Sequence, residues 1–467
     1  MTVPSRGYSE LMDGLTMNRQ HWLIFGVCAA GFAFDAFDFQ LMALAAPAIA
    51  KDWHLTPARM GAILSVTVIG MAIGAVAFGA VSDRFGRRRG FQLTIGLFGL
   101  FCGLSAFAQN VEQLAVLRFL TGVGIGGLAP IDTAIMTEFM PRAHRGRLVA
   151  LWAAFFPLGG ILASLAAWAI GSQYGWRPLF LVGVAPAIMI LLVRLLIPES
   201  PRYLLSQKRD DEARAAIGWL AGYSIPKTAE SAFRAVKMGT PEEPSRAGLR
   251  TLFSAAYRRR TIMAWVLWIG WSFSYFGMLL WLPSLLGHFR QISGPAILFY
   301  ISSFLGAGIA GRLLVTGIID RFGRPHTISA FGVLAALSLL IFSQQMSGST
   351  LLLWGMLFSF FQDGGLSAIT PYTPELYPTK VRGAGVGYAI GAGRIASVVA
   401  PVAVGFLLPS GPTPIFLMFA AGYLVSAVVV LIYGVETAGL ALEEASLETS
   451  TLAPDPSQIK ATNPGLN

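Results

Sequence analysis

Two aspartates lie three residues apart in an otherwise apolar stretch near the N-terminus. Asp35 and Asp38 are enclosed by Phe34 and Phe39, and their spacing places both carboxylates on nearly the same face of a helix. Two close carboxylates cannot both ionise cheaply where the dielectric constant is low, so one of them is expected to hold a proton near neutral pH. The pair is therefore a candidate proton carrier. The alternatives are a solvated helix end or a fixed pair with an arginine.

Four further charged residues interrupt apolar segments: Arg118, Asp132, Asp363 and Arg394. A charge at the centre of a bilayer costs about 2.5–3.5 kcal/mol on insertion scales, so each is a candidate functional residue. Arg118 and Asp132 are separated by about 21 Å along a helix and cannot pair with each other. Arg118 is expected to find its carboxylate on the segment with the two aspartates. Asp132 is expected either to face a cavity or to lie in water near a helix end.

A guanidinium among aromatic side chains is suited to binding a flat anion. Arg394 can bind a carboxylate through two hydrogen bonds and remains charged at any physiological pH. Tyr275 and Phe276 lie in the middle of their segment, and aromatic faces attract both cations and rings. The alternative is a structural pair between Arg394 and Asp363 on adjacent helices. The predicted substrate site comprises Arg394, Tyr275, Phe276, Tyr388, Asp132 and Asp363.

The composition explains why these charges are conspicuous. Hydrophobic residues make up 55% of the 467 residues and charged residues 12%, whereas soluble domains carry about 25% charged residues. With a mean hydropathy of +0.63, the chain is predicted to be a polytopic membrane protein. Both cysteines fall in apolar stretches, which indicates no disulfide framework. No constellation of residues indicates a metal, a cofactor or an enzyme.

Apolar segments long enough to span a bilayer, about 20 residues each, can be counted as twelve helices. Six lie on each side of a polar stretch, and the fifth is predicted as one segment over 148–176. Apolar spacing from Leu205 to Leu220 predicts an amphipathic helix against the membrane surface. The predicted all-α fold has a cytoplasmic N-terminus (1–20), a six-helix half (21–197), a cytoplasmic linker (198–258), a second six-helix half (259–435) and a disordered cytoplasmic tail (436–467).

Basic residues set the predicted orientation, because positive charges near span ends remain in the cytoplasm. The loops after predicted spans two, four, eight and ten carry clusters of arginine and lysine. The opposite loops carry only Lys51, Arg59, Arg177 and Arg290. Both termini and the linker are therefore predicted to be cytoplasmic. The net charge of +10 is then largely a topology signal, so nucleic acid is not an expected partner.

An internal repeat divides the chain. The motif Asp-Arg-Phe-Gly-Arg at 83–87 recurs at 320–324, and a Glu-x-x-Pro-x3-Arg-Gly motif at 138–146 recurs at 375–383, both with an offset of 237 residues. Two separated motifs with one offset indicate two halves in parallel orientation. In transporters of this kind, the substrate site lies near the midplane between the halves, and rocking of the halves alternates access to it.

The repeated motifs contain candidate gating residues. Gly79 is expected to let the second span approach a neighbouring helix closely. The acidic residues are expected to pair with nearby arginines, Glu138 with Arg145 and Glu375 with Arg382, in contacts that break when the cytoplasmic side opens. The alternative is that these charges only set the topology. The predicted gating residues are Gly79, Asp83, Arg84, Arg87, Glu138, Arg145, Asp320, Arg321, Arg324, Glu375 and Arg382.

These motifs resemble those of the major facilitator superfamily. The resemblance covers almost all of 20–435, although Thr316 stands where the repeat would place a second Gly79. It implies the twelve-helix fold and a part for Arg118 in proton coupling. The segments that carry it are Gly79-x3-Asp83-Arg-Phe-Gly-Arg-Arg-Arg, Arg118-x3-Gly122-x-Gly124-x-Gly126 and, similar to the sugar-porter-like branches, Pro198-Glu-Ser-Pro-Arg202.

Two branches of the superfamily are most similar. Asp35-Ala-Phe-Asp38 resembles an Asp-Gly-x-Asp element of aromatic acid:proton symporters, with Ala36 in place of glycine. The segments 129–132, 275–283 and 374–378 are more similar to metabolite:proton symporters, which include niacin transporters. Both branches imply import of a small aromatic monocarboxylate, such as a hydroxybenzoate or nicotinate, together with a proton. The expected protein is a monomer in the bacterial inner membrane, with an organic anion, protons and lipid as its partners.

Two other functions remain open. One is a drug or metabolite exporter driven by proton antiport, but such proteins usually carry Gly-Pro-x-x-Gly-Gly on the fifth span, where this chain has Phe-Pro-Leu-Gly-Gly at 156–160. The other is a non-transporting sensor on a transporter scaffold, which would not need charges inside the membrane. Sugar uptake is disfavoured because the seventh span lacks a glutamine-rich segment.

Overall fold

The structure is a computed structural model. In the part of the chain that it describes, every regular element is a helix, and nine helices are long and apolar enough to cross a membrane. This confirms the all-α prediction, while the count of twelve spans and the cytoplasmic termini stay predictions. The described residues are 15–185, 193, 196–222, 249–292, 294–345 and 348–437.

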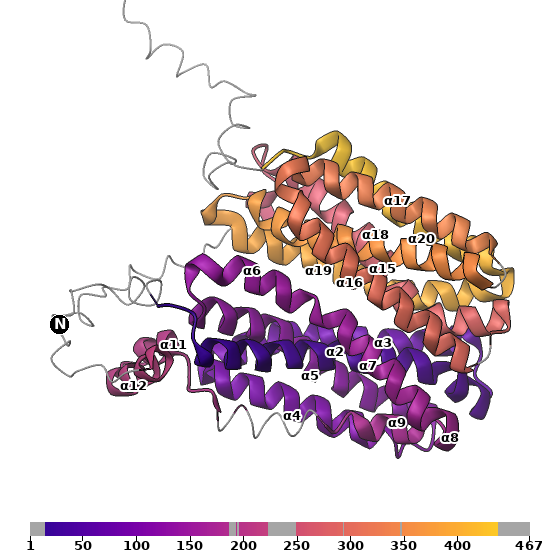
Figure 1. Ribbon diagram of the computed structural model, residues 1–467, viewed down its shortest axis with the longest axis horizontal. Helices are drawn as coiled ribbons and strands as arrows, with labels where there is room; N and C mark the ends of the chain where they lie inside the picture. The colour runs from indigo at the N-terminus through magenta and orange to yellow at the C-terminus, as the bar shows by residue number, and fades with distance from the viewer. Residues whose placement is uncertain are drawn as a thin grey trace, which may run out of the picture.

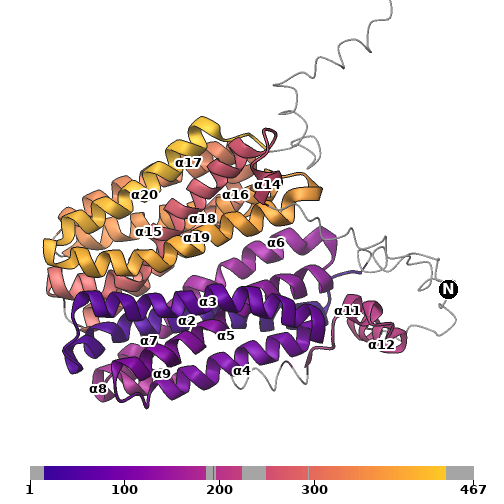
Figure 2. The same ribbon diagram turned by 180° about the vertical axis from the view of Figure 1, so that it is seen from behind.

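The helices form two bundles that lie side by side (Figures 1 and 2). The first bundle is drawn in indigo to magenta and the second in orange to yellow, so each half of the chain builds one bundle. The first contains α2 (Arg19–Asp52), α3 (Pro57–Phe85), α4 (Arg87–Ser105), α5 (Val111–Phe139), α6 (Arg142–Ala153), α7 (Phe155–Ala166), α8 (Ser172–Tyr174) and α9 (Arg177–Val182). The second contains α15 (Arg258–Arg290), α16 (Gly294–Phe322), α17 (Arg324–Gln344), α18 (Gly348–Glu375), α19 (Thr379–Leu407) and α20 (Pro412–Tyr433), with a 3₁₀ turn (Leu408–Ser410) between the last two.

The fifth predicted span is broken into several pieces. Helix α6 ends at Ala153 and α7 begins at Phe155, and a π-helical turn (Ala167–Gly171) follows α7. Pro157 lies just inside α7, and a proline cannot donate the hydrogen bond that would continue the preceding helix. The stretch Arg147–Gly171 nevertheless remains one of the nine described segments that are long and apolar enough to cross a membrane, so the fifth span is a single segment with a local break. Of the sixth predicted span, residues 186–192, 194 and 195 lie outside the described part of the chain.

Glycines let α3 and α5 pack backbone to backbone. A side chain on Gly70 would overlap the carbonyl oxygen of Phe119, and one on Gly126 would overlap that of Met71. Without a hydrophobic driving force between helices in lipid, such close contact is a main source of helix association. The predicted close approach at Gly79 is wrong in this conformation, because nothing lies within 4 Å of the position that its Cβ would take.

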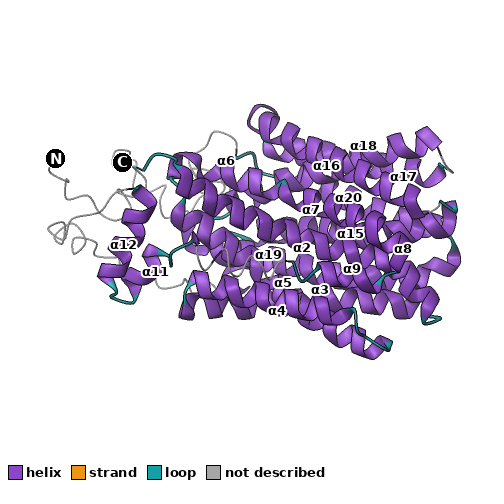
Figure 3. Cartoon of the chain, turned by 60° about the horizontal axis from the view of Figure 1, so that its bottom comes forward, coloured by secondary structure: helices purple, strands orange, loops and turns teal. Residues whose placement is uncertain are grey.

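The amphipathic stretch from Leu205 to Leu220 is divided between two short helices. Helix α11 (Pro201–Ser206) and α12 (Asp210–Ala221) are separated at Lys208, which has a φ of 58°. The apolar face of α12 is buried as the spacing predicts, and the Nδ2 of Asn18 donates to the carbonyl of Leu220 at 2.5 Å. The two helices thus lie at the end of the bundle where α2 begins (Figure 3). A further helix, α14 (Leu249–Leu252), precedes α15.

The two halves meet closely at the opposite end of the bundle. There α3 begins and α19 ends, and a side chain on Gly61 would overlap the carbonyl oxygen of Pro401. A side chain on Gly405 would likewise approach Pro57 too closely, and Ser65 Oγ donates to the carbonyl of Val398 at 2.7 Å. The structure is therefore closed between the halves on the side away from α11 and α12.

Candidate functional site

Asp38 and Arg118 form an ion pair inside the first half. Arg118 Nη1 donates to Asp38 Oδ1 at 2.9 Å, and neither residue is accessible to solvent. The same oxygen accepts from Cys102 Sγ at 3.1 Å, while Arg118 Nη2 donates to Thr121 Oγ1 at 2.7 Å. The guanidinium also lies 4.9 Å from the ring centroid of Phe180. The expected partner of Arg118 on the first span is thus Asp38, and the pair is held from three neighbouring elements.

Asp35 and Arg394 face each other across the two halves. Asp35 is buried on α2, its Oδ1 makes no hydrogen bond within the described chain, and it interacts electrostatically with Arg394 of α19. The Arg394 guanidinium lies 5.2 Å from the ring centroid of Phe276. Its buried Nη1 also has no hydrogen-bond partner among the described residues. Such a guanidinium has donors ready for an anion.

Asp363 pairs with an arginine that the sequence reasoning missed. Arg312 of α16 donates to Asp363 Oδ1 from Nε at 2.8 Å and from Nη2 at 2.5 Å. Tyr275 Oη donates to the same oxygen at 3.4 Å. Arg312 Nη1 also reaches the other half, where it donates to the carbonyl of Ala153 at 3.2 Å. The alternative pairing of Arg394 with Asp363 is therefore wrong.

A signal for Arg312 was present in the repeat. Arg312 directly follows the charge-free run at 291–311, so it does not interrupt an apolar run as the other four charges do. However, the span that contains it must reach Asp320, as the second span reaches Asp83, because the two motifs are equivalent. Arg312 therefore had to lie two turns inside its helix, where a charge indicates function.

Asp132 is buried in the first half, where it interacts electrostatically with Asp35. It is inaccessible to solvent, and neither carboxyl oxygen makes a hydrogen bond with a described residue. It packs close to Gly31, and Trp152 donates nearby to the carbonyl of Cys28 at 3.2 Å. The expectation of a wet position near a helix end is wrong, and Asp132 is not part of the cavity wall described below.

One cavity lies beside the Arg312–Asp363 pair. It has a volume of about 30 Å³ between α15, α16 and α18, and Gln40 of α2 contributes to its wall from the other half. Tyr275 and Asp363 are among its lining residues, so the structure brings these two predicted residues together. Tyr388, in contrast, is 40% exposed on α19 and does not line this cavity.

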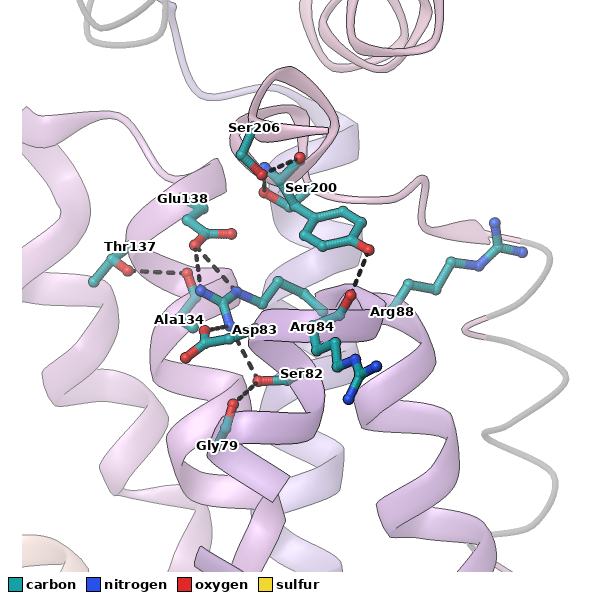
Figure 4. Close-up of polar contacts among 12 residues, drawn as sticks. Gly79, Ser82, Asp83, Arg84, Arg88, Ala134, Thr137, Glu138, Ser200 and Ser206 are labelled. Atoms are coloured by element: carbon teal, nitrogen blue, oxygen red, sulfur yellow. Dashed lines mark hydrogen bonds and ion pairs between the residues drawn. The ribbon is translucent and has the colours of Figure 1, made fainter. Parts of the chain in front are cut away.

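The motif at the end of α3 forms a network with α5 (Figure 4). Arg87 contacts Asp83 and donates from Nε to Glu138 Oε1 at 3.2 Å, and its Nη1 donates to Ser82 Oγ at 3.0 Å. Glu138 thus pairs with Arg87, and its additional pairing with Arg145 stays a prediction. The side chain of Arg145 lies outside the described residues.

The second copy of the motif repeats this network. Arg324 Nη1 lies 2.7 Å from Asp320 Oδ1, and Arg324 Nε donates to Glu375 Oε2 at 3.1 Å. Arg382, the predicted partner of Glu375, instead donates to the carbonyl of Tyr377 at 3.2 Å. In each half, the glutamate of the Glu-x-x-Pro-x3-Arg-Gly motif therefore pairs with the last arginine of the Asp-Arg-Phe-Gly-Arg motif. The remaining predicted gating arginines lie over neighbouring rings, Arg84 over Phe85 and Arg321 over Phe322.

The repeat extends to two glutamates that cap helices. Glu199 Oε1 accepts from the backbone N–H of Arg88 at 3.1 Å, and Glu436 Oε1 accepts from that of Arg324 at 3.1 Å. These glutamates are again 237 residues apart in sequence, and a carboxylate at a helix N-terminus is stabilised by the helix dipole. Glu436, assigned by the sequence to a disordered tail, is therefore anchored, while residues 438–467 lie outside the described part.

Comparison with known proteins places the chain in a family. A model of the family described as "Sugar (and other) transporter" matches residues 25–448. The niacin transporter NiaP of Acinetobacter baylyi is 33% identical over 93% of this chain and 99% of its own length. The 4-hydroxybenzoate transporter PcaK of the same organism is 30% identical over 83% of this chain and 85% of its own length.

The fold agrees with this assignment. The inward-open xylose transporter XylE from E. coli superimposes with a TM-score of 0.76 over 93% of this chain and all of that chain, at 19% identity. The family and its members are transporters and not enzymes, as the sequence predicts. Together with the apolar helices, the bacterial relatives identify a multi-pass protein of the inner membrane. The chain belongs to the sugar (and other) transporter family of the major facilitator superfamily.

Proposed function

We propose that the protein imports a small aromatic monocarboxylate together with a proton. The observation that carries this proposal is Arg394, whose guanidinium lies against Phe276 with an unpartnered buried nitrogen. A carboxylate would supply the missing acceptors, and its ring would pack against the aromatic side chain. Relatives named for niacin, 4-hydroxybenzoate and gallate transport support this substrate class.

Asp35 would couple the proton to the substrate. When it is ionised, its carboxylate competes with the substrate for Arg394, to which it is electrostatically linked. When it is protonated, Arg394 is free to bind the anion, so each ligand favours binding of the other. Asp38 and Arg118 would complete the proton path on the same side of the site, since Asp38 lies one helical turn beyond Asp35.

Movement of the halves would alternate access to this site. In the present conformation the halves are closed where α3 meets α19, and the two charged networks hold helix ends together within each half. Arg394 and Asp35 belong to different halves, so a rocking motion changes the distance between them. The gating roles of the two networks, including Asp83, Arg87, Asp320 and Arg324, follow from their position at the opposite end of the bundle.

Arg394→Ala tests the site directly. We expect calorimetry on the purified full-length chain to show an affinity for benzoate, 4-hydroxybenzoate or nicotinate about 10- to 100-fold lower than in the unaltered protein, because charged hydrogen bonds contribute about 1.5–3 kcal/mol. Arg394→Lys should restore only part of the affinity, since lysine cannot bind a carboxylate bidentately. Arg59→Ala, at an exposed position, is the control. Unchanged affinity in well-folded Arg394→Ala would exclude this role.

A further inference from the structure

The cavity beside the Arg312–Asp363 pair has a polar part and an apolar part. Five lining residues carry polar groups, and the rest of the wall is apolar, with Met278 and Phe304 among its members. A volume of about 30 Å³ has room for water or for one polar substituent but not for a ring. The cavity is therefore the size of a subsite. The polar lining residues are Gln40, Tyr275, Ser359, Gln362 and Asp363; we call this group the polar chamber.

Gln40 brings an unused amide into the polar chamber. The residue is 2% exposed on α2, and its Nε2 makes no hydrogen bond with any residue in the described part of the chain. A buried amide without partners is costly, about 1–3 kcal/mol for each unsatisfied group. An acceptor atom brought by a ligand would remove that cost.

Asp363 offers an acceptor on the opposite wall. Its Oδ1 is occupied by Arg312 and Tyr275, whereas Oδ2 has no hydrogen-bond partner within the described ranges. Asp363 forms an ion pair with Arg312, and a carboxylate can only accept hydrogen bonds. The side-chain oxygen Oε1 of Gln362 already accepts a hydrogen bond from Tyr423 Oη. The polar chamber thus presents a donor from one half and an acceptor from the other.

A short series of contacts connects the polar chamber to Arg394. The Arg394 guanidinium lies 5.2 Å from the Phe276 ring, which is 5.4 Å from the Tyr275 ring. Phe276 also lies 5.7 Å from Phe39, the neighbour of Gln40 in sequence. Arg394 and the chamber residue Tyr275 therefore both lie next to the Phe276 ring, which places the anion site and the polar chamber near each other.

We propose that the polar chamber binds the ring hydroxyl of a hydroxylated aromatic carboxylate whose carboxylate binds Arg394. A hydroxyl both donates and accepts, so it can donate to Asp363 and accept from Gln40. A ring nitrogen, as in nicotinate, can only accept and would leave Asp363 facing a lone pair. This assignment rests on the proposed function and adds to it a preference for hydroxybenzoates over both benzoate and nicotinate.

The test compares affinities within each variant, so that the yield of folded protein does not affect the result. Calorimetry on the full-length chain would measure benzoate, 3- and 4-hydroxybenzoate and nicotinate. We expect the better hydroxybenzoate to bind at least about 10-fold more tightly than benzoate, and Gln40→Leu to reduce this ratio about 3- to 10-fold. Gln40→Met is a second variant of similar length. Gln109→Leu, at an exposed position, should leave the ratio unchanged.

The outcomes separate this assignment from the proposed function. Equal affinity for benzoate and both hydroxybenzoates, or an equal loss for all acids in Gln40→Leu, would overturn the hydroxyl site and leave the Arg394 site standing. A selective loss of nicotinate in Gln40→Leu would also overturn it, since a ring acceptor would then occupy the polar chamber. Binding of none of the four acids by the unaltered protein would overturn the proposed function itself.

Discussion

At the scale of single residues, the ion pair of Asp38 and Arg118 is the contact that depends most on both partners being present. Both are inaccessible to solvent, and each has one polar atom without a hydrogen bond in the described structure, Oδ2 of Asp38 and Nε of Arg118. Removing one member of such a pair leaves an uncompensated buried charge, whereas removing both does not. The pair is therefore sensitive to single substitutions.

Asp38→Asn is expected to destabilise the protein by about 3–5 kcal/mol because Arg118 loses its counter-charge. The double variant Asp38→Leu/Arg118→Leu should recover the thermal unfolding temperature but not proton-driven accumulation in liposomes. Asp211→Asn, whose carboxyl is largely exposed, is the control for both measurements. Full accumulation by both Asp35→Asn and Asp38→Asn would contradict the coupling role.

At the scale of elements, glycine placement decides how closely the helices pack. Gly122 and Gly126 of α5 lie against backbone atoms of α3, at Thr67 and Met71. The motif Arg118-x3-Gly122-x-Gly124-x-Gly126 thus has two structural roles. It carries the buried arginine, and its glycines let α5 approach α3 closely. The sequence motif revealed the glycines, but only the packed helices show which ones are in contact.

Gly126→Val should therefore lower stability by about 1–3 kcal/mol, the usual cost of overpacking a close contact. Thermal unfolding of the detergent-solubilised protein would measure the change. Gly306→Val is the matched control, because a Cβ at Gly306 meets nothing within 4 Å. Equal unfolding temperatures for the two variants would show that the α3–α5 contact is looser than described.

At the scale of the whole molecule, the two halves share their charged networks but not their sites. The equivalent positions include Glu199 and Glu436, and Tyr275 stands 237 residues after Asp38. Each half has its own buried ion pair, but Arg312 has an alanine, Ala75, at the equivalent position. The repeated parts hold helix ends, whereas the unrepeated charges lie either inside one half, as Asp38 and Arg118 do, or between the halves, as Arg312 and Arg394 do.

Gly405→Val is expected to hold the halves apart where α19 meets α3, because its side chain has no room beside Pro57. A cysteine introduced at Ser65, which is buried against Val398, should then react faster with a membrane-impermeant thiol reagent. Both native cysteines are buried, so the label reports on the new site. Gly317→Val, with open space around it, should leave the labelling rate unchanged, and the same rate in Gly405→Val would refute this prediction.

The sequence by itself determined the membrane class, the two equivalent halves and most of the buried charges. These follow from hydropathy, from a repeat and from the cost of a charge in lipid, all of which are local or additive properties of the chain. The partners of those charges were decided only by the tertiary structure. Asp363 pairs with Arg312 and Glu138 with Arg87, because pairing depends on which helix faces meet. The rotation of each helix arises from packing between distant segments, and a linear pattern does not encode it.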